Sequence, residues 1–164
     1  SGVAFPFSDD YSFGILQSMA HSVWFRERCS TLETRLRYTS RSVFQSFPWP
    51  QSPASEAVDG VASASAAIVN YRAKAFRLGY SLADQYDVLR RPGRSELRDL
   101  HTALDAAVAT AYGFEPDEDL LTQILELNLL VTQREKDGHP VTPPGSLPTT
   151  AVPSTWSWPA PTVE

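Results

Sequence analysis

A chain of 164 residues is long enough to bury the core of one ordinary domain or of two small ones. The hydrophobic fraction of 42% and the charged fraction of 20% are typical of globular proteins, and the apolar runs are too short to cross a bilayer. The only cysteine, Cys29, excludes an internal disulfide and a cysteine-based zinc site, so a reducing cytoplasm is the simplest location. No secretory signal is visible at the N-terminus. Since Ser1-Gly2 resembles a cloning scar and no initiator methionine follows, we expect a piece of a larger protein.

The first predicted element is a helix over residues 11–28, where apolar side chains recur every three or four positions. Ser8, Asp9 or Asp10 can cap its start. Residues 30–47 lose this period and predict turns and short strands. Residues 47–50 (FPWP) then stop any regular element, because each proline removes an amide donor, and residues 51–56 are predicted to be a linker.

The second half of the chain predicts a small helical bundle over residues 57–137. An alanine-rich helix over residues 56–78 should end at Gly79, and Ser81 can cap a shorter helix after it. Ser95 can cap a helix over residues 96–112, and Gly113 stands where a left-handed C-cap is needed. The apolar stripe of the alanine-rich helix comprises Val58, Val61, Ala62, Ser65, Ile68, Val69, Arg72 and Phe76.

Asp117 or Asp119 opens a last helix that should end near residues 136–138. The following Pro/Ser/Thr-rich residues, 138–164, predict a disordered or polyproline-like tail. Trp156 and Trp158 in that tail could form a docking peptide or simply lie on the body of the protein. The predicted fold class is therefore mainly α (α+β): a helix with short strands in residues 1–50, the bundle, and the tail.

Motifs for catalysis are absent from the sequence. There is no glycine-rich cofactor loop, no Asn/Asp-Pro-Pro-aromatic motif for methyl transfer to an amine, and no carboxylate and lysine set for phosphodiester cleavage. We therefore predict no catalytic residue, no cofactor and no metal site in this chain. His21, His101 and His139 are far apart, and a buried histidine with a hydrogen bond is the simpler interpretation of the first two. Cys29 has no histidine at a catalytic spacing and suits a small packing residue.

Positive charge is concentrated in residues 26–41, although the formal net charge of the chain is −5. Against these cations stand only Glu27 and Glu33. Such a patch usually meets an anionic partner. Two functions follow: nucleic-acid binding, or a helical protein-interaction module whose patch serves solubility or an acidic partner. The arginines are Arg26, Arg28, Arg35, Arg37 and Arg41.

Two blocks of motifs resemble MmeI-like (type IIL) adenine-specific DNA methyltransferases. Residues 13–18 (FGILQS), then His21, Trp24, Arg26, Cys29, Leu32, Arg37-Tyr38 and residues 47–50 (FPWP), have the order and spacing found at the end of that family's target-recognition domain. Residues 97–108 (LRDLHTALDAAV), 111–114 (AYGF) and 125–128 (LELN) are similar to its C-terminal helical domain. The resemblance covers about residues 7–135.

The resemblance implies a parent enzyme with an N6-adenine methyltransferase domain that uses S-adenosylmethionine, often with a nuclease domain. This chain would lack both, and its partners would be double-stranded DNA and the parent's methyltransferase domain. Positions matching Glu33 and Arg35 would read one base pair of the target. A glutamate can accept a hydrogen bond from cytosine N4, and an arginine can bind guanine O6 and N7, so the pair suits C·G. The alternative is a surface ion pair between them.

The remaining arginines of the patch, Arg26, Arg28, Arg37 and Arg41, are candidates for contacts to the DNA backbone. Within the second block, His101 and Asp105 are four residues apart and can hydrogen-bond to each other within the helix. Tyr112 and Phe114 flank Gly113 and should pack it against the bundle.

Overall fold

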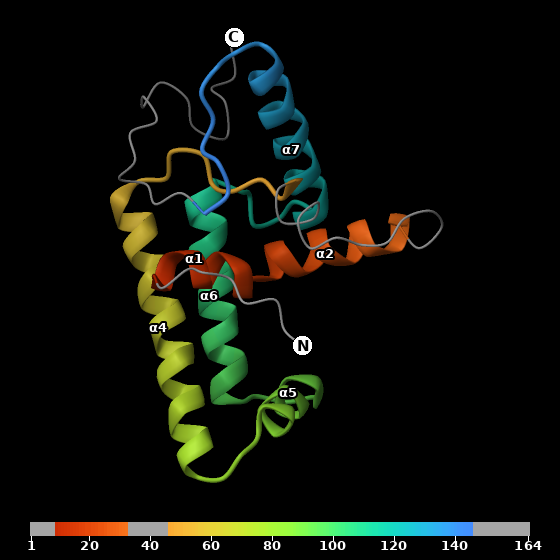
Figure 1. Cartoon of the computed structure of the whole chain (residues 1–164). Coiled ribbons are helices and arrows are strands. Elements are labelled where there is room, and N and C mark those ends of the chain that lie inside the picture. The colour runs from red at the N-terminus through yellow and green to blue at the C-terminus, as the bar shows by residue number, and fades with distance from the viewer. Residues whose placement is uncertain (1–8, 33–45, 146–164) are drawn as a thin grey trace.

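The computed structural model describes residues 9–32 and 46–145, and these residues form helices and connecting segments (Figure 1). Helices α4 and α6 lie side by side, α1 crosses them, α5 packs near one end, and α2 projects from the body beneath α7. The prediction of a mainly helical class is confirmed. The helices are α1 (Asp10–Gln17), α2 (Met19–Leu32), α4 (Ser55–Arg77), α5 (Leu82–Arg90), α6 (Glu96–Tyr112) and α7 (Leu120–Lys136).

The short strands expected in residues 30–47 are not seen. Residues 30–32 instead continue α2, and residues 33–45 lie outside the described part of the chain. Across 9–32 and 46–145 no residue is in a strand.

The first helix is broken at Ser18, so the prediction of one helix over residues 11–28 was wrong. Ser18 is extended, with φ −74° and ψ 161°, and its N–H and hydroxyl both donate to the Ile15 carbonyl. A serine side chain that bonds to nearby backbone offers the chain an alternative to continuing a helix. The next amide, that of Met19, donates to the Asp105 carboxylate at 2.8 Å. The start of α2 is therefore attached to α6, at the place where the sequence predicted an Asp105–His101 pair; that prediction was also wrong.

The predicted helix caps are confirmed. Asp9 accepts from the Ser12 amide, and Ser81 forms a capping box with Asp84. Ser95 and Asp119 cap α6 and α7 through the amides three residues on. Gly79 and Gly113 follow α4 and α6 with positive φ. Since each cap lies within a few residues of its partner, its signal is local.

Part of the predicted stripe of α4 is exposed. Val61, Ser65 and Ile68 are buried, but Val69 is 41% exposed and Phe76 53%. At about 100° per residue, Val69 lies roughly 80° around the helix from Val61, which puts it at the edge of the buried face.

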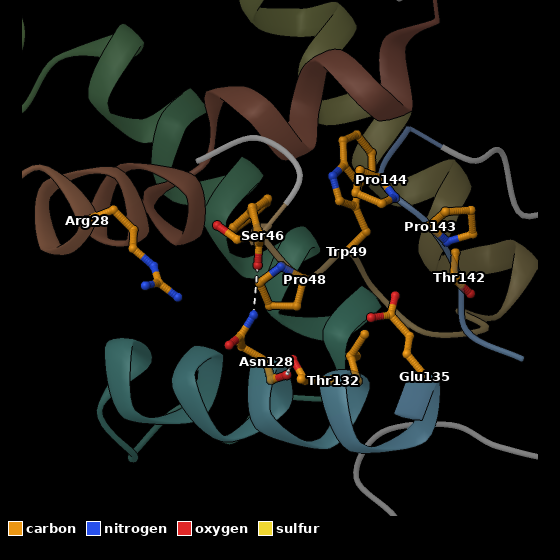
Figure 2. Close-up of a pocket in the computed structure, with 12 residues that line it drawn as sticks. Arg28, Ser46, Pro48, Trp49, Asn128, Thr132, Glu135, Thr142, Pro143 and Pro144 are labelled. Carbon is orange, nitrogen blue, oxygen red and sulfur yellow. Dashed lines mark hydrogen bonds between the residues drawn. The ribbon is translucent and has the colours of Figure 1, made fainter. Parts of the chain in front are cut away.

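Residues 46–51 are held by hydrogen bonds from α6, from α7 and from Thr142 of the tail (Figure 2). The Asn128 side chain donates to the Ser46 carbonyl at 2.8 Å, and the Tyr112 hydroxyl donates to the Pro48 carbonyl at 2.7 Å. Gln51 is only 3% exposed, and its amide pairs with both backbone groups of Thr142. The predicted linker is thus packed at its first residue.

The predicted tail also departs from disorder where it begins, because Thr142 is buried against Gln51. Its later part, residues 146–164 with Trp156 and Trp158, lies outside the described residues.

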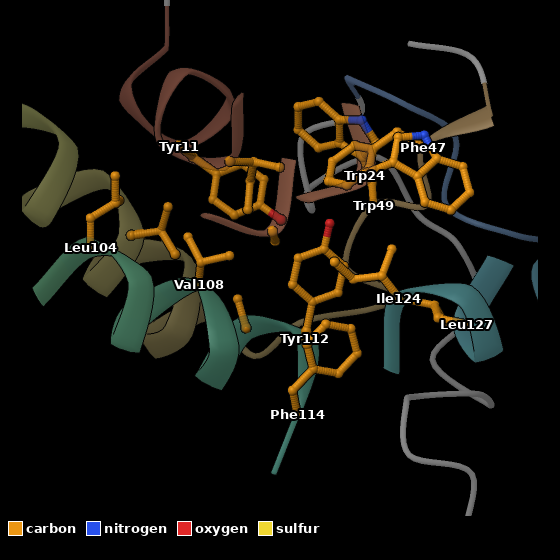
Figure 3. Packing of buried hydrophobic residues seen from close by; sticks show 14 of the residues in the cluster. Tyr11, Trp24, Phe47, Trp49, Leu104, Val108, Tyr112, Phe114, Ile124 and Leu127 are labelled. Atoms are coloured by element: carbon orange, nitrogen blue, oxygen red, sulfur yellow. The ribbon is translucent and has the colours of Figure 1, made fainter. Parts of the chain in front are cut away.

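One hydrophobic core joins the two halves of the chain (Figure 3). Trp24 and Phe47 pack at 6.2 Å between ring centroids, and Tyr112 stacks on Phe114 at 4.6 Å, as predicted for the residues around Gly113. A domain boundary at residues 51–56 stays a prediction, although residues from both of its sides share this core. The largest buried side chains are Trp24, Trp49, Tyr112, Phe47, Ile15, Ile68, Leu97, Leu104, Ile124, Leu127 and Val61.

Candidate nucleic-acid interface

Helix α2 carries the two candidate arginines that the structure describes. Its first amide is held by Asp105, and its Trp24 side chain is fully buried. The Arg28 guanidinium lies over the Trp24 ring, 4.4 Å from the centroid, in a cation–π contact. Helix α2 ends at Leu32, directly before Glu33. A helix fixed to the core at its start therefore leads to the segment in which base-reading residues are predicted.

Arg26 and Arg28 face different sides of α2. They are two residues apart, which is roughly 200° around a helix. The exposed Arg26 lines a cleft formed with α4, α5 and α6, whereas Arg28 lines a cleft formed with α7. The structure therefore does not bring these two candidate backbone contacts together on one face. Glu33, Arg35, Arg37 and Arg41 lie outside the described residues, and their roles stay predictions.

The cleft between α2 and α7 has a volume of about 230 Å³ and contains both signs of charge (Figure 2). Arg28 approaches it from α2, and Glu135 lines it from α7. Asn128, also on α7, anchors Ser46 at its edge. The segment that leaves α2 at Leu32 thus returns to the described structure at Ser46, whose carbonyl accepts a partly buried hydrogen bond. The sequence marked Asn128 only as part of a motif and did not show this anchoring role.

The two helical histidines have structural surroundings. Burial lowers the pKa of His21, and a hydrogen bond to the Leu16 backbone opposes that shift. The His21 side chain is partly buried, and its ring packs edge-on against Phe47 at 5.1 Å, which is compatible with the structural role predicted for it. His101 differs, because its buried Nε2 has no hydrogen-bond partner among the described residues. Burial, and then the positive charge of Arg72, lower the pKa of His101.

Asp105 is the charged residue of α6 that accepts the hydrogen bond from the first amide of α2. Burial raises the pKa of its carboxyl, and the hydrogen bond from Met19 opposes this shift. No three His, Cys, Asp or Glu side chains are grouped to hold a metal in residues 9–28 and 46–145. Of the helices in the described ranges, none has the length and apolar character needed to cross a membrane. The Cys29 side chain lies outside the described residues.

Comparison of the sequence with protein families shows which kind of domain the first part of the chain resembles. Residues 2–51 match the family described as "MmeI, target recognition domain". This match covers α1, α2 and residues 46–51, and α2 carries the candidate arginines Arg26 and Arg28.

Two relatives extend the similarity into the helical part. DNA methyltransferase A of Bacillus subtilis (strain 168) is 31% identical over 127 residues, which are 76% of this chain and 14% of that protein. The solved structure of the type IIL restriction-modification enzyme MmeI in complex with DNA matches with a TM-score of 0.62 and 31% identity, over 78% of this chain and 17% of that one.

These matches confirm the resemblance to the MmeI-like (type IIL) family. The chain spans less than a fifth of the length of either relative.

Proposed function

We propose that this chain is the C-terminal part of a site-specific N6-adenine DNA methyltransferase of a restriction-modification system. It would supply the end of the target-recognition domain and a helical domain that supports it. The observation that carries this proposal is the match of residues 2–51 to the MmeI target recognition domain, together with the 0.62 TM-score to an MmeI structure solved with DNA.

The helical domain supports recognition through rigid attachment. Asp105 holds the start of α2, and Tyr112 and Asn128 hold residues 46–48, where the chain returns from the predicted reading segment. Residues used to read bases must be positioned to within about half an ångström by a rigid scaffold. The bundle is thus the platform on which the reading segment stands.

The partners follow from the same proposal. The chain would contact double-stranded DNA and the methyltransferase domain of its parent, in the cytoplasm. The parent would bind S-adenosylmethionine outside this chain. No catalytic residue is proposed here.

Glu33 and Arg35 are proposed to read one C·G pair, and the test uses the intact parent enzyme. Exchanging them, as Glu33→Lys with Arg35→Asp, reverses the hydrogen-bond donor and acceptor. The preferred base pair at that position should change towards G·C, while other positions of the target stay the same. Each single change leaves a polar group facing a mismatched base edge and should cost about 1–3 kcal/mol of discrimination. Sequencing of methylated sites reads the outcome.

A matched control is the charge exchange Asp87→Arg with Arg90→Asp on α5, an exposed ion pair at 3.3 Å. It should leave the target unchanged. If the Glu33 and Arg35 exchange also leaves it unchanged, the two residues form only a surface ion pair.

A second candidate is a helical protein-interaction module without a nucleic-acid role. Large apolar side chains exposed around the α4–α5 turn favour it, because exposed apolar patches often mark protein contacts. Duplex DNA binding that weakens as salt rises separates the two, since only phosphate contacts release condensed counterions. Affinity that is flat across salt concentrations would favour the interaction module. The exposed side chains are Phe76, Leu78, Tyr80, Leu82 and Tyr86.

A further inference from the structure

The cleft on the Arg26 side of α2 gathers cations from three helices. Its volume is about 500 Å³, and Arg26 from α2, Arg72 from α4 and Arg98 from α6 all line it. Asp105 is the one carboxylate among its lining residues. The sequence did not reveal this group, because the three arginines are far apart in the chain and Arg72 was read as part of an apolar stripe.

Two of these charged groups are already held by hydrogen bonds. The Arg98 guanidinium donates to the Leu89 carbonyl at 2.7 Å and also to the carbonyls of Arg91 and Gly93, so it fastens the end of α5. Asp105 accepts from the Met19 amide. The Arg98 charge therefore stays in the cleft, while both of its terminal nitrogens donate to carbonyls of the protein.

Arg26 and Arg72 are the cations that remain for a ligand. Arg26 is exposed and lines the cleft. Arg72 lies over the Tyr86 ring, 5.9 Å from the centroid, and no described residue accepts a hydrogen bond from its buried Nε. The tyrosine face steadies the guanidinium by a cation–π contact. Arginine suits phosphate because its planar guanidinium can donate two parallel hydrogen bonds.

His101 also lines this cleft, and its pKa responds to the charges around it. Arg72 on α4, Arg26 on α2, and Arg98 and Asp105 on its own helix all line the same cleft. Burial and the Arg72 charge lower the pKa of His101. An anion placed beside Arg72 would oppose that second cause and raise this pKa.

We propose that this cleft binds a phosphate group of the DNA backbone through Arg26 and Arg72. The proposal rests on the function proposed above. Arg26 lies six positions before the end of α2 at Leu32, which is roughly 9 Å along the helix. The major groove is about 12 Å wide, so a helix end that leads into the groove would leave Arg26 near the strand bordering it. A phosphate held there would set the register of the reading segment without reading sequence.

The first test measures binding of the whole chain to a duplex of roughly 20 base pairs across a salt series. Each phosphate contact makes log affinity fall by about 0.9 for each tenfold rise in salt, so its contribution at about 0.1 M salt is about eightfold in affinity relative to about 1 M salt. Arg26→Gln and Arg72→Gln should each lose about this much on any duplex sequence. Arg77→Gln, an exposed cation of α4 outside the cleft, is the matched control and should bind like wild type.

The second test uses inorganic phosphate in place of chloride at equal ionic strength, with the His101 pKa followed by NMR. Phosphate should raise this pKa in wild type and in Arg77→Gln, and should have little effect in Arg72→Gln. Far-UV circular dichroism checks that each variant is folded.

The outcomes separate the two proposals. If wild type binds DNA but both cleft variants bind like Arg77→Gln, the cleft proposal is wrong and the proposed function stands. If wild type binds no DNA yet phosphate raises the His101 pKa, DNA is not the source of the phosphate. Absence of both responses overturns the cleft site altogether.

Discussion

Gly14 of α1 packs closely against α4 and α6, and its replacement by alanine tests the packing of α1 on these two helices. A Cβ atom at Gly14 would lie 2.8 Å from Val61 Cγ1, 3.2 Å from Ser65 Cβ and 3.3 Å from Leu104 Cδ1. Val61 cannot easily turn away, because it is fully buried and a β-branched side chain in a helix has one strongly preferred rotamer. The alanine must therefore separate the helices or strain Val61.

Gly60 on α4 provides a matched control, since a Cβ there would meet nothing within 4 Å. Both Gly→Ala changes lie inside helices and should gain about 1 kcal/mol from helix propensity. Overpacking of a well-packed core costs about 1–3 kcal/mol. Gly60→Ala should therefore stabilise the fold by up to about 1 kcal/mol, whereas Gly14→Ala should fall about 1–3 kcal/mol below it.

Urea unfolding followed by far-UV circular dichroism measures this difference between the two variants. The slope against urea should be the same for both, so that the midpoints compare free energies of unfolding. Equal stability of Gly14→Ala and Gly60→Ala would show that the close approach of α1 to Val61 is absent in solution.

Three further outcomes are expected. Tyr112→Phe removes the hydroxyl that donates to the Pro48 carbonyl, and should lower the free energy of unfolding in urea by about 1–3 kcal/mol; an unchanged value would rule out this bond. Gln51→Ala removes both hydrogen bonds to Thr142, so limited proteolysis should cut residues 139–145 faster than in wild type, with equal rates contradicting the attachment. Because the pKa of His101 is lowered in the fold, the folded state binds fewer protons, and stability present above about pH 6.5 should decrease as pH falls through that value. His101→Gln should reduce the decrease in the free energy of unfolding between about pH 7.5 and about pH 5.5, measured by urea denaturation at each pH. An equal decrease in wild type and variant would contradict the assignment to His101.

The helix boundaries could be predicted because their signals are local. Ser95 caps α6 through an amide three residues away, and Gly113 takes the left-handed conformation that ends the same helix. Such chemistry can be read from a few neighbouring residues, whatever the rest of the fold does.

The contacts that build the candidate interface could not be predicted in this way. The Asp105 bond to Met19 joins residues 86 apart in sequence, and the Gln51 bond to Thr142 joins residues 91 apart. Periodicity predicted one helix through Ser18, because it describes which side chains face the core and does not show where another helix holds the backbone. Arg26 and Arg28 were grouped by composition, but helical geometry directs them to different clefts.

The Asp105 bond to the first amide of α2 has a consequence for the exchange of recognition segments between related enzymes. A chimera joined near residue 51 would place α1 and α2 of one enzyme on α6 of the other. The direction of α2 would be kept only if the residue at position 105 could accept the hydrogen bond from the first amide of α2. In the same chimera Gly14 would come from one parent and Val61 from the other, although these two residues pack closely against each other. To preserve the orientation of α2, residues 9–145 should therefore be exchanged as one unit.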